Sequence, residues 1–421
     1  MVAAGAKATN GTALLAKITC PNCWEPFAPA QTVWISSHPD LIGDPLLGPD
    51  EPLRFLPTRF RPNGDALDAR GQVCHRIACP RCHLPVARAC LEIPPFFASV
   101  IGAPACGKSY FLAGMTWELK RTLHQQFSVS FVDADTESNA HLNSYQELLF
   151  QNARPDQLVA IPKTPLAGDL YRGVLVDGHV VNRPRPLLFA LHPQPPHPGS
   201  VDPQKFGRVL CLYDNAGEHF LPGQDTTGTQ VTQHLAKSRV ILFLFDPTQD
   251  HRFRELCRRG SNDPQLTESA RVGQQDTILN EMALRIRRYR GLAQSAKHDA
   301  HLVIVVTKSD TWSHLVDLPR SLPCQTRHNN QLTSLDISQI DDVSKRVREL
   351  MLQACPQVVN AADAFATEVI FIPVSAVGGS PTVDSQTRSL VVRPSDIRPC
   401  WVTVPILYAL SRWTNGLIGQ V

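Results

Sequence analysis

The chain has no apolar run long enough to cross a bilayer and no strong excess of charge. Its longest apolar stretches, VILFLF and WVTVPILYAL, fall short of the roughly 20 residues that a membrane-spanning helix needs. A net charge of only +3 gives no reason to expect a nucleic-acid partner or an anionic membrane surface. The N-terminal stretch lacks the continuous apolar core of a secretory signal, so we expect a cytoplasmic protein without a transmembrane segment.

A change of composition near residue 93 divides the 421-residue chain. Residues 1–92 are rich in Pro, Asp and Arg, whereas in 93–421 short apolar runs alternate with amphipathic stretches. Such alternation predicts an α/β fold, in which helices cover both faces of a mostly parallel sheet. We expect polar, irregular inserts near 183–204 and 311–333.

The expected strands share runs of Val, Ile, Leu and Phe, and the expected helices share an amphipathic pattern. The strands are expected at 96–101, 128–133, 185–193, 207–214, 239–246, 301–306 and 367–374. The helices are expected at 109–127, 138–152, 277–292, 337–355 and 404–413.

The segment GAPACGKS follows one expected strand and opens an expected helix. It matches G-x-x-x-x-G-K-[ST], in which glycine lets the backbone curl until successive N–H groups point at a phosphate. Lys108 would lie between the β and γ phosphates, Ser109 would bind Mg²⁺, and the helix N-terminus would favour the anion. A glycine turn with a surface lysine is the alternative. The predicted nucleotide-binding residues here are Gly102, Ala103, Pro104, Ala105, Cys106, Gly107, Lys108, Ser109 and Tyr110, with Cys106 a small residue that fits rather than a reactive thiol.

A second motif, DNAG, stands at the end of the expected strand GRVLCLYD. A carboxylate at the carboxyl end of a strand can hold Mg²⁺, in this case through water, and this is the expected role of Asp214. The backbone N–H of Gly217 can contact a γ-phosphate and so respond to its presence. A lone D-x-x-G is usually a turn, but after a phosphate loop it favours a nucleotide site.

A third motif, TKSD, follows the strand HLVIVV and would face the base. Asp310 can accept two hydrogen bonds from guanine, at N1–H and the exocyclic amine, and adenine offers no such pair. Lys308 can lie along the base and brace the phosphate loop, beside Thr307. Further on, Ser375 and Ala376 follow another strand, where a backbone N–H can meet the guanine O6. The alternative is that Asp310 only caps a helix.

Two CPxC motifs precede the phosphate loop. Each presents two sulfurs on one tight turn, and two such turns supply the four thiolates of a tetrahedral Zn²⁺ site. We expect a structural zinc site in a zinc-ribbon-like module with a long insert, because a bound metal would fold a segment with few apolar residues. Iron fits the same geometry, a reduced pair or a disulfide is the alternative, and Cys74 and His75 are further candidates. The predicted ligands are Cys20, Cys23, Cys79 and Cys82.

The order GAPACGKS, DNAG, TKSD and SA, each at a strand end, resembles the Ras-like P-loop GTPases of the TRAFAC class over about residues 96–413. The CPxC motifs and the Pro-rich insert resemble, more narrowly, the bacterial double-GTPase group, for which defence roles are proposed. This resemblance implies hydrolysis of GTP to GDP and phosphate in a Mg²⁺-dependent switch cycle. It also implies an effector protein or a homodimer that reads or activates the switch.

Such a switch needs a threonine that completes the Mg²⁺ shell, for which we favour Thr164 over Thr136. Glu218 stands where many relatives carry a water-orienting Gln or His, and its charge repels a γ-phosphate, so we expect slow intrinsic turnover. The resemblance therefore implies catalytic roles for Lys108, Thr164 and Glu218. A P-loop ATPase, or a scaffold that binds a nucleotide with little turnover, remains the alternative. The sequence does not choose a charge-stabilising arginine among Arg172, Arg183, Arg185 and Arg239.

Overall fold

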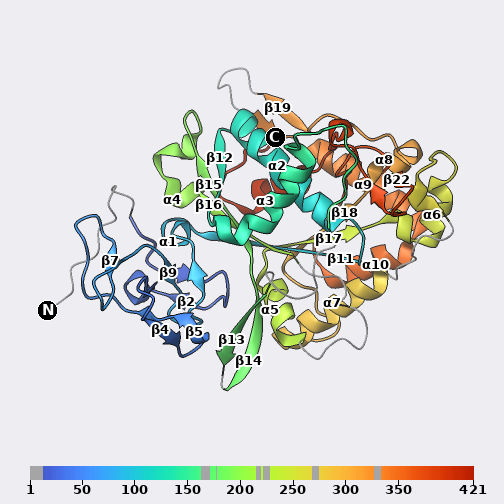
Figure 1. The fold of residues 1–421 in the computed structure, drawn as a ribbon. Helices are drawn as coiled ribbons and strands as arrows, with labels where there is room; N and C mark the ends of the chain where they lie inside the picture. The colour runs from blue at the N-terminus through green and yellow to red at the C-terminus, as the bar shows by residue number, and fades with distance from the viewer. Residues whose placement is uncertain are drawn as a thin grey trace.

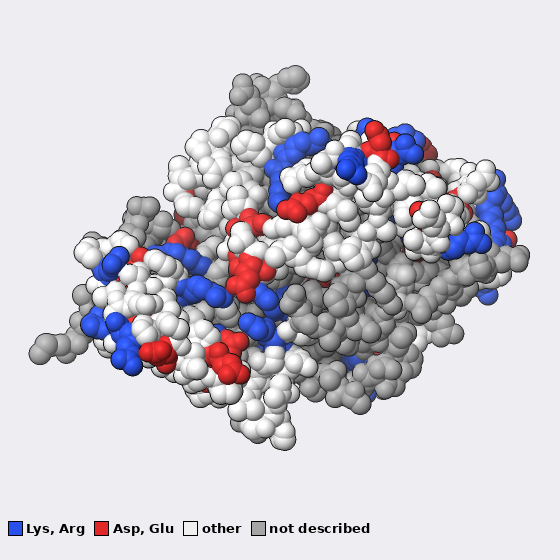
Figure 2. All heavy atoms as spheres, in the orientation of Figure 1, with Lys and Arg blue, Asp and Glu red and all other residues white. Residues whose placement is uncertain are grey.

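A small N-terminal module packs beside a larger α/β body in the computed structural model (Figure 1). The structure describes residues 13–162, 171–176, 178–214, 220, 228–267, 275–326 and 333–421. On the face shown in Figure 2, described Lys and Arg side chains alternate with Asp and Glu over the module. No described helix is both long and apolar enough to span a membrane.

The body is built on a seven-stranded sheet within the described residues. Its strands, in spatial order, are β12 (Val129–Asp133), β15 (Leu187–Pro193), β16 (Arg208–Asp214), β11 (Pro95–Gly102), β17 (Val240–Phe245), β18 (His301–Val306) and β21 (Val369–Pro373). Only β15 runs opposite to the other six strands, so the expected mostly parallel sheet is confirmed. The carboxyl ends of β11, β16, β17, β18 and β21 therefore meet at one edge.

Helices lie on both sides of this sheet, with α2 and α3 above and α5 and α7 below in Figure 1. The body's longer helices are α2 (Lys108–Phe127), α3 (Thr136–Phe150), α5 (Gly228–Lys237), α6 (His251–Cys257), α7 (Gln275–Arg290), α9 (Ile337–Ala354), α10 (Pro356–Phe365) and α11 (Val404–Trp413). β17 is apolar along its whole length, and β18 is apolar after His301, because both faces of the sheet are covered there.

The N-terminal module consists of short strands around the four CPxC cysteines. Its four-stranded sheet has the order β10 (Pro85–Val86), β9 (Ile77–Ala78), β3 (Val33–Ile35) and β6 (Arg54–Phe55). The same module holds the two-stranded pairs β1 (Ile18–Thr19) with β2 (Pro26–Phe27), β4 (Ile42–Asp44) with β5 (Gly48–Pro52), and β7 (Ala66–Leu67) with β8 (Val73–Cys74), and the short helix α1 (Ala89–Glu92). Its buried cluster continues onto one face of β15 and β16, so the module covers that part of the sheet.

Two expected inserts contain regular structure. The strand predicted at 185–193 is confirmed as β15 (Leu187–Pro193), which lies inside the sheet. The prediction that all of 183–204 is an irregular insert is therefore wrong over these residues and at α4 (Pro203–Phe206). Before β15 lies a hairpin that the sequence did not predict, β13 (Tyr171–Val176) with β14 (His179–Pro184). The second expected insert, 311–333, overlaps α8 (Ser309–Trp312) and β19 (Cys324–Thr326), and β19 pairs with β20 (Thr333–Leu335). Outside both inserts, β22 (Thr382–Val383) pairs with β23 (Leu390–Val391).

Candidate nucleotide-binding site and cysteine cluster

The predicted phosphate loop curls between β11 and α2. Ala105 and Gly107 adopt left-handed backbone angles, with φ of 61° and 92°, and α2 begins at Lys108 directly after them. The Nζ of Lys108 donates to the carbonyl oxygens of Gly102 and Ala103 at 3.2 and 3.3 Å. The lysine side chain thus folds back over the carbonyl oxygens of its own loop. The loop leads directly into the N-terminus of the 20-residue helix α2, whose free N–H groups favour an anion.

Gly102 is required where the loop leaves the sheet. A Cβ at this position would lie 2.7 Å from the carbonyl oxygen of Leu244 and 2.8 Å from Cys106 Sγ, closer than atoms can approach. Cys106 is fully buried, and burial raises the pKa of its thiol. An enclosed thiol that keeps its proton is a poor nucleophile.

A cavity of about 300 Å³ joins residues of four predicted motifs. It is lined by residues of the phosphate loop, by Asp214 at the end of β16, by Thr307 and Lys308 after β18, and by Ala376 after β21. These segments are far apart in sequence and meet because the carboxyl ends of their strands share one edge of the sheet. The structure thus gathers the predicted phosphate side and base side around one space.

Asp214 is the acidic group of this cavity. Its Oδ1 is buried and has no hydrogen-bond partner in the described part of the chain. Burial raises the pKa of Asp214 to about 6, and the Lys108 ammonium only partly offsets this rise. Ser109 lines the same cavity, so a carboxylate and a hydroxyl, both oxygen ligands that Mg²⁺ prefers, face one space. Thr164, Gly217 and Glu218 lie outside the described residues.

Asp310 is held at the other end of the site. The Oγ of Ser375 donates to Asp310 Oδ1 at 2.5 Å and accepts from the N–H of Gly378 at 2.8 Å. Burial raises the pKa of the Asp310 carboxyl, and the Ser375 hydrogen bond works in the opposite direction. The two predicted base-side residues are thus in direct contact, next to Ala376 in the cavity wall.

Lys308 makes a contact that the sequence did not predict. Its Nζ lies 2.6 Å from Asp246 Oδ2 and 3.0 Å from Thr248 Oγ1. The expected brace to the phosphate loop is instead made by Gln249, whose Nε2 donates to the carbonyl oxygen of Pro104 at 3.1 Å. The available signal for Asp246 was its place at the end of RVILFLFD, the same position that singled out Asp214.

An apolar wall completes the cavity and was also missed. The Tyr110 hydroxyl accepts a hydrogen bond from the N–H of Ile161 at 3.1 Å, and Val159 pairs with Val392 as an isolated bridge. This wall consists of Ile161, Pro162, Val377, Pro381, Leu390 and Val392. Apolar surfaces of this kind suit an aromatic base, and polar groups at the two ends would fix its orientation.

A second cavity of about 260 Å³ opens on the other side of the phosphate loop. Ser109 and Asp214 line it as well as the first cavity, and Arg185 lines it from the chain just before β15. Because Leu187 pairs with Leu212 in antiparallel register, continuing that register places residue 185 opposite Asp214. Among the four candidate arginines, the structure therefore brings Arg185 to the side of the site that Ser109 and Asp214 line.

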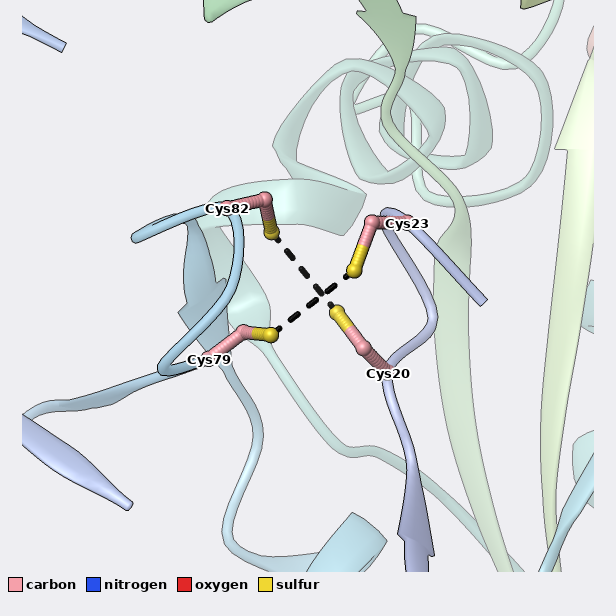
Figure 3. Close-up of side chains that lie close together, drawn as sticks. All are labelled: Cys20, Cys23, Cys79 and Cys82. Carbon is pink, nitrogen blue, oxygen red and sulfur yellow. Dashed lines mark hydrogen bonds between the residues drawn. The ribbon is translucent and has the colours of Figure 1, made fainter. Parts of the chain in front are cut away.

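The four predicted zinc ligands form one buried cluster (Figure 3). The Sγ atoms of Cys20 and Cys82 lie 3.8 Å apart, and those of Cys23 and Cys79 lie 3.7 Å apart. Four sulfurs bound tetrahedrally at about 2.3 Å from a zinc ion would be about 3.8 Å from one another. A disulfide needs about 2.05 Å, so the cluster is spaced for a metal and not for bridges. The residues present fit Zn²⁺.

The two knuckles share one local geometry. In the first, Asn22 N–H points at Cys20 Sγ at 3.3 Å, and Trp24 has a φ of 59°. In the second, Arg81 N–H points at Cys79 Sγ at 3.3 Å, and His83 has a φ of 60°. The further candidates lie elsewhere, since Cys74 Sγ contacts Asp68 and His75 faces Asp65.

No protein-family model matches the chain, and no curated protein matches it. Among solved structures, it is similar to the S. cerevisiae Ski7 GTPase-like domain bound to GTP, with 14% identity over 76% of this chain and 50% of that chain and a TM-score of 0.30. It is similar to Era in complex with MgGDPNP and 16S ribosomal RNA, with 12% identity over 68% and 53% and a TM-score of 0.22. It is also similar to elongation factor SelB from Methanococcus maripaludis with GppNHp, with 8% identity over 67% and 30% and a TM-score of 0.21.

This chain thus spans about half of each of the first two chains. It spans 30% of the third. All three are described with GTP or an analogue bound. Because every TM-score is below 0.5, these likenesses establish neither the fold nor the function of this chain.

Proposed function

We propose that this protein binds GTP and GDP with Mg²⁺ and hydrolyses GTP as a P-loop molecular switch. The observation that supports this proposal most is the single cavity shared by the Lys108 loop, Asp214 and the Lys308 segment. A phosphate loop alone fits any nucleoside triphosphate. The contact between Asp310 and Ser375 beside this cavity adds a carboxylate that matches the two adjacent N–H donors of guanine.

Magnesium would be held on the phosphate side of the cavity by Ser109 and Asp214. Asp214 supports this assignment because its Oδ1 is buried without a hydrogen-bond partner in the described part of the chain. When bound, the ion supplies positive charge to the β and γ phosphates. Ser109 and Asp214 would position it, and Lys108 would turn from the loop carbonyls to the phosphates.

Hydrolysis needs positive charge on the side of the γ-phosphate away from the base. Arg185 is suited to this because it lines the second cavity together with Ser109 and Asp214. It stays near that position through Ser138 Oγ at 3.5 Å and Glu137 Oε1 at 3.7 Å. Thr164 and Glu218 keep their roles as predictions, and so does a part in bacterial defence. The cysteine cluster would hold a structural Zn²⁺ that folds the N-terminal module.

Nucleotide competition tests this proposal most directly. Purified protein is loaded with a fluorescent GDP analogue and Mg²⁺, and unlabelled GTP or ATP is added in turn. We expect GTP to displace the probe at concentrations at least about 100-fold lower than ATP, because two hydrogen bonds to a charged group are worth about 1.5–3 kcal/mol each. Equal competition by ATP would contradict guanine recognition, and phosphate release from GTP then measures turnover.

A further inference from the structure

Tyr213 and Asp214 are consecutive residues of β16 that face opposite sides of the sheet. Tyr213 belongs to the buried cluster of the N-terminal module, together with Val209 and Cys211 on the same face. Asp214 instead lines both cavities of the proposed nucleotide site. Because the two residues share one peptide unit, a shift of the backbone at Tyr213 also moves Asp214.

The first cysteine knuckle holds the Tyr213 hydroxyl by two hydrogen bonds. This hydroxyl donates to the carbonyl oxygen of Pro21 at 2.5 Å and accepts from Trp24 Nε1 at 2.9 Å. Pro21 lies between Cys20 and Cys23, and Trp24 directly follows Cys23. Burial raises the pKa of Tyr213 well above its ordinary value, so the hydroxyl keeps its proton.

Helix α5, which follows the DNAG motif in the chain, also takes part in this contact. His234 of α5 stacks on the Tyr213 ring with centroids 4.9 Å apart. The His234 Nδ1 lies 2.7 Å from Ser99 Oγ, and Ser99 is the β11 neighbour of Tyr213 in the sheet. Trp24 lies against both rings, so the knuckle contacts the residue before the DNAG motif and the helix after it.

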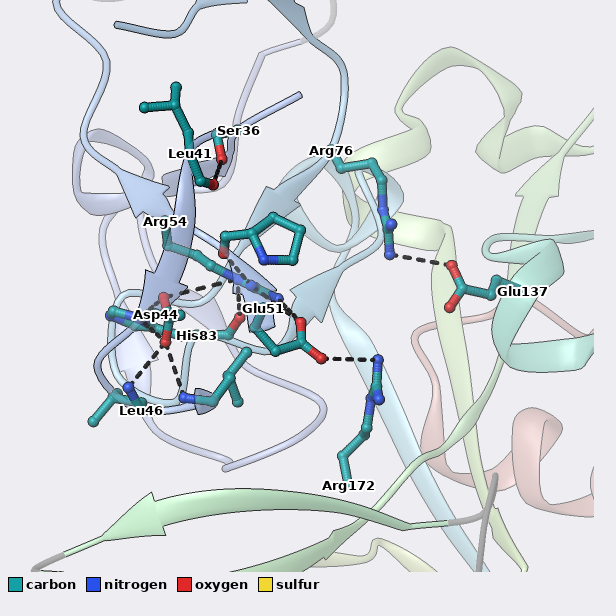
Figure 4. Close-up of polar contacts among 12 residues, drawn as sticks. Ser36, Leu41, Asp44, Leu46, Glu51, Arg54, Arg76, His83, Glu137 and Arg172 are labelled. Carbon is teal, nitrogen blue, oxygen red and sulfur yellow. Dashed lines mark hydrogen bonds and ion pairs between the residues drawn. The ribbon is translucent and has the colours of Figure 1, made fainter. Parts of the chain in front are cut away.

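The module also contacts the elements that flank residues 163–170 (Figure 4). Glu51 Oε1 lies 3.7 Å from Arg172 on β13, the strand that follows this segment. Arg76 Nη2 lies 3.1 Å from Glu137 of α3, and Glu137 in turn contacts Arg185. The module therefore contacts the neighbours of both segments in which the predicted Thr164, Gly217 and Glu218 lie.

We propose that the metal-bound cysteine knuckle positions the Asp214 end of β16 through Tyr213, so that metal binding at the cysteines and Mg²⁺–nucleotide binding are thermodynamically coupled. The inference rests on the proposed nucleotide-binding function. Metal binding orders the turn that carries Pro21 and Trp24, and this turn fixes Tyr213. Coupling between two sites is reciprocal, so a bound nucleotide must also tighten the cysteine site by the same factor.

Tyr213→Phe tests the coupling in the full chain with its metal bound. This change keeps the ring and its stacking on His234 and removes only the hydroxyl that Pro21 and Trp24 hold. Tyr408→Phe is the matched control, because Tyr408 is a buried tyrosine of α11 outside both cavities. Metal analysis is expected to find one zinc ion per chain in the wild type and in both variants.

Two measurements carry the result. The affinity for a fluorescent GDP analogue with Mg²⁺ is expected to fall about tenfold in Tyr213→Phe and to stay unchanged in Tyr408→Phe. The rate at which a chromogenic chelator removes zinc is expected to slow when Mg²⁺ and GDP are added to the wild type, and to lose most of this dependence in Tyr213→Phe. Trp24→Phe removes the other donor and is expected to behave as Tyr213→Phe does.

The two proposals fail in different ways. If the wild type does not bind the GDP analogue, the proposed function is wrong. If the wild type binds it and Tyr213→Phe binds it equally well, with the same chelation rate with and without nucleotide, the coupling is wrong and the proposed function stands. A loss of zinc from Tyr213→Phe with unchanged nucleotide affinity would also overturn the coupling.

Discussion

Ser375 Oγ donates a hydrogen bond to Asp310 Oδ1 at 2.5 Å, and Gly378 N–H donates to the same hydroxyl at 2.8 Å. The serine hydroxyl thus links the backbone N–H of Gly378 to the Asp310 carboxylate, and this link fixes the orientation of the carboxylate beside the cavity. A carboxylate that is already oriented loses little freedom when a base binds, so its hydrogen bonds contribute more fully to affinity.

Exchanging Asp310 for asparagine is expected to change which base is bound. Asp310→Asn replaces a carboxylate, which accepts from guanine, by an amide that can donate to the C2 carbonyl oxygen of xanthine. GTP affinity should fall at least about 100-fold, and XTP should become the better competitor for the probe. Improved XTP binding would also show that the variant folds. Unchanged GTP affinity would remove Asp310 from base recognition.

Lys108→Ala is expected to abolish the binding of GTP and ATP alike. The lysine is the cation of the phosphate loop, and its loss leaves the phosphates without their direct charge partner. Equilibrium binding with a fluorescent nucleotide measures the effect, and the expected loss is at least about 100-fold. Lys345→Ala, at an exposed position of α9, is the control and should bind as the wild type does. Retained binding in Lys108→Ala would place the phosphates elsewhere.

Most of the sheet could be predicted because its central strands are buried on both faces and therefore contain long apolar runs. β17 and β18 are the clearest examples. The hairpin β13–β14 could not be, since its strand HVVNRP has mixed polarity. The contact of the hairpin with the module, a hydrogen bond from Leu175 N–H of β13 to the carbonyl oxygen of Leu46, follows no local pattern. The apolar run of β15 correctly predicted a strand, although the Pro-rich sequence around it also led to the prediction of an irregular insert at 183–204.

The candidate site could be predicted where a motif fixes both spacing and chemistry, as for Lys108 and the four cysteines. Asp246 was missed because a single acidic residue at a strand end also occurs in ordinary turns. Only the 2.6 Å distance between Asp246 Oδ2 and Lys308 Nζ shows that Asp246 belongs to the candidate site. The contact between Trp24 and Tyr213 joins residues 189 positions apart and follows no local pattern. Tertiary contacts of this kind appear only once the module is docked.

The cysteine cluster is expected to bind one zinc ion per chain, measurable by metal analysis of the purified protein. Cys79→Ser removes one of four thiolates, and it should lower both zinc content and the melting temperature. Cys74→Ser is the matched control, because Cys74 is equally buried in the same module but lies outside the cluster. Full zinc content in Cys79→Ser would contradict the ligand assignment, and iron in place of zinc would correct the metal.

The binding of Mg²⁺ is expected to weaken below about pH 6. Burial raises the pKa of Asp214 from 3.8 to about 6, so this carboxyl takes up a proton as the pH falls through that value. Mg²⁺ needs the anion, and on this account its affinity should fall about tenfold between pH 7 and pH 5. Asp214→Asn is the reference variant, because it lacks the titrating carboxyl. Any pH dependence of Mg²⁺ affinity that remains in this variant comes from protonation of the nucleotide phosphates. Equal pH dependence in both proteins would contradict the assignment.

The same shift has a consequence for the protein without nucleotide. Between pH 3.8 and about 6 the folded chain holds the Asp214 proton that the unfolded chain has released. The contribution of this group to the free energy of unfolding therefore falls as the pH rises through that range. Chemical denaturation at pH 4.5 and 6.5 should show a smaller loss of stability in Asp214→Asn than in the wild type.

Arg185→Ala is expected to slow hydrolysis more than it weakens binding. In the proposed mechanism the guanidinium meets charge that develops on the γ-phosphate, so it stabilises the transition state more than the bound nucleotide. Single-turnover hydrolysis of GTP should fall on the order of 100-fold, while the affinity for GDP changes by less than about threefold.

Arg346→Ala provides the control for this last test. Arg346 lies on α9, outside both cavities, and pairs with Asp317, so its loss should leave the hydrolysis rate unchanged. Arg185→Lys keeps the charge but not the planar fork, and an intermediate rate is expected because bidentate contact with phosphate oxygens is lost. An equal fall in rate for both alanine variants would assign Arg185 to the fold alone. A wild type that binds GTP without hydrolysing it would favour a nucleotide-binding scaffold.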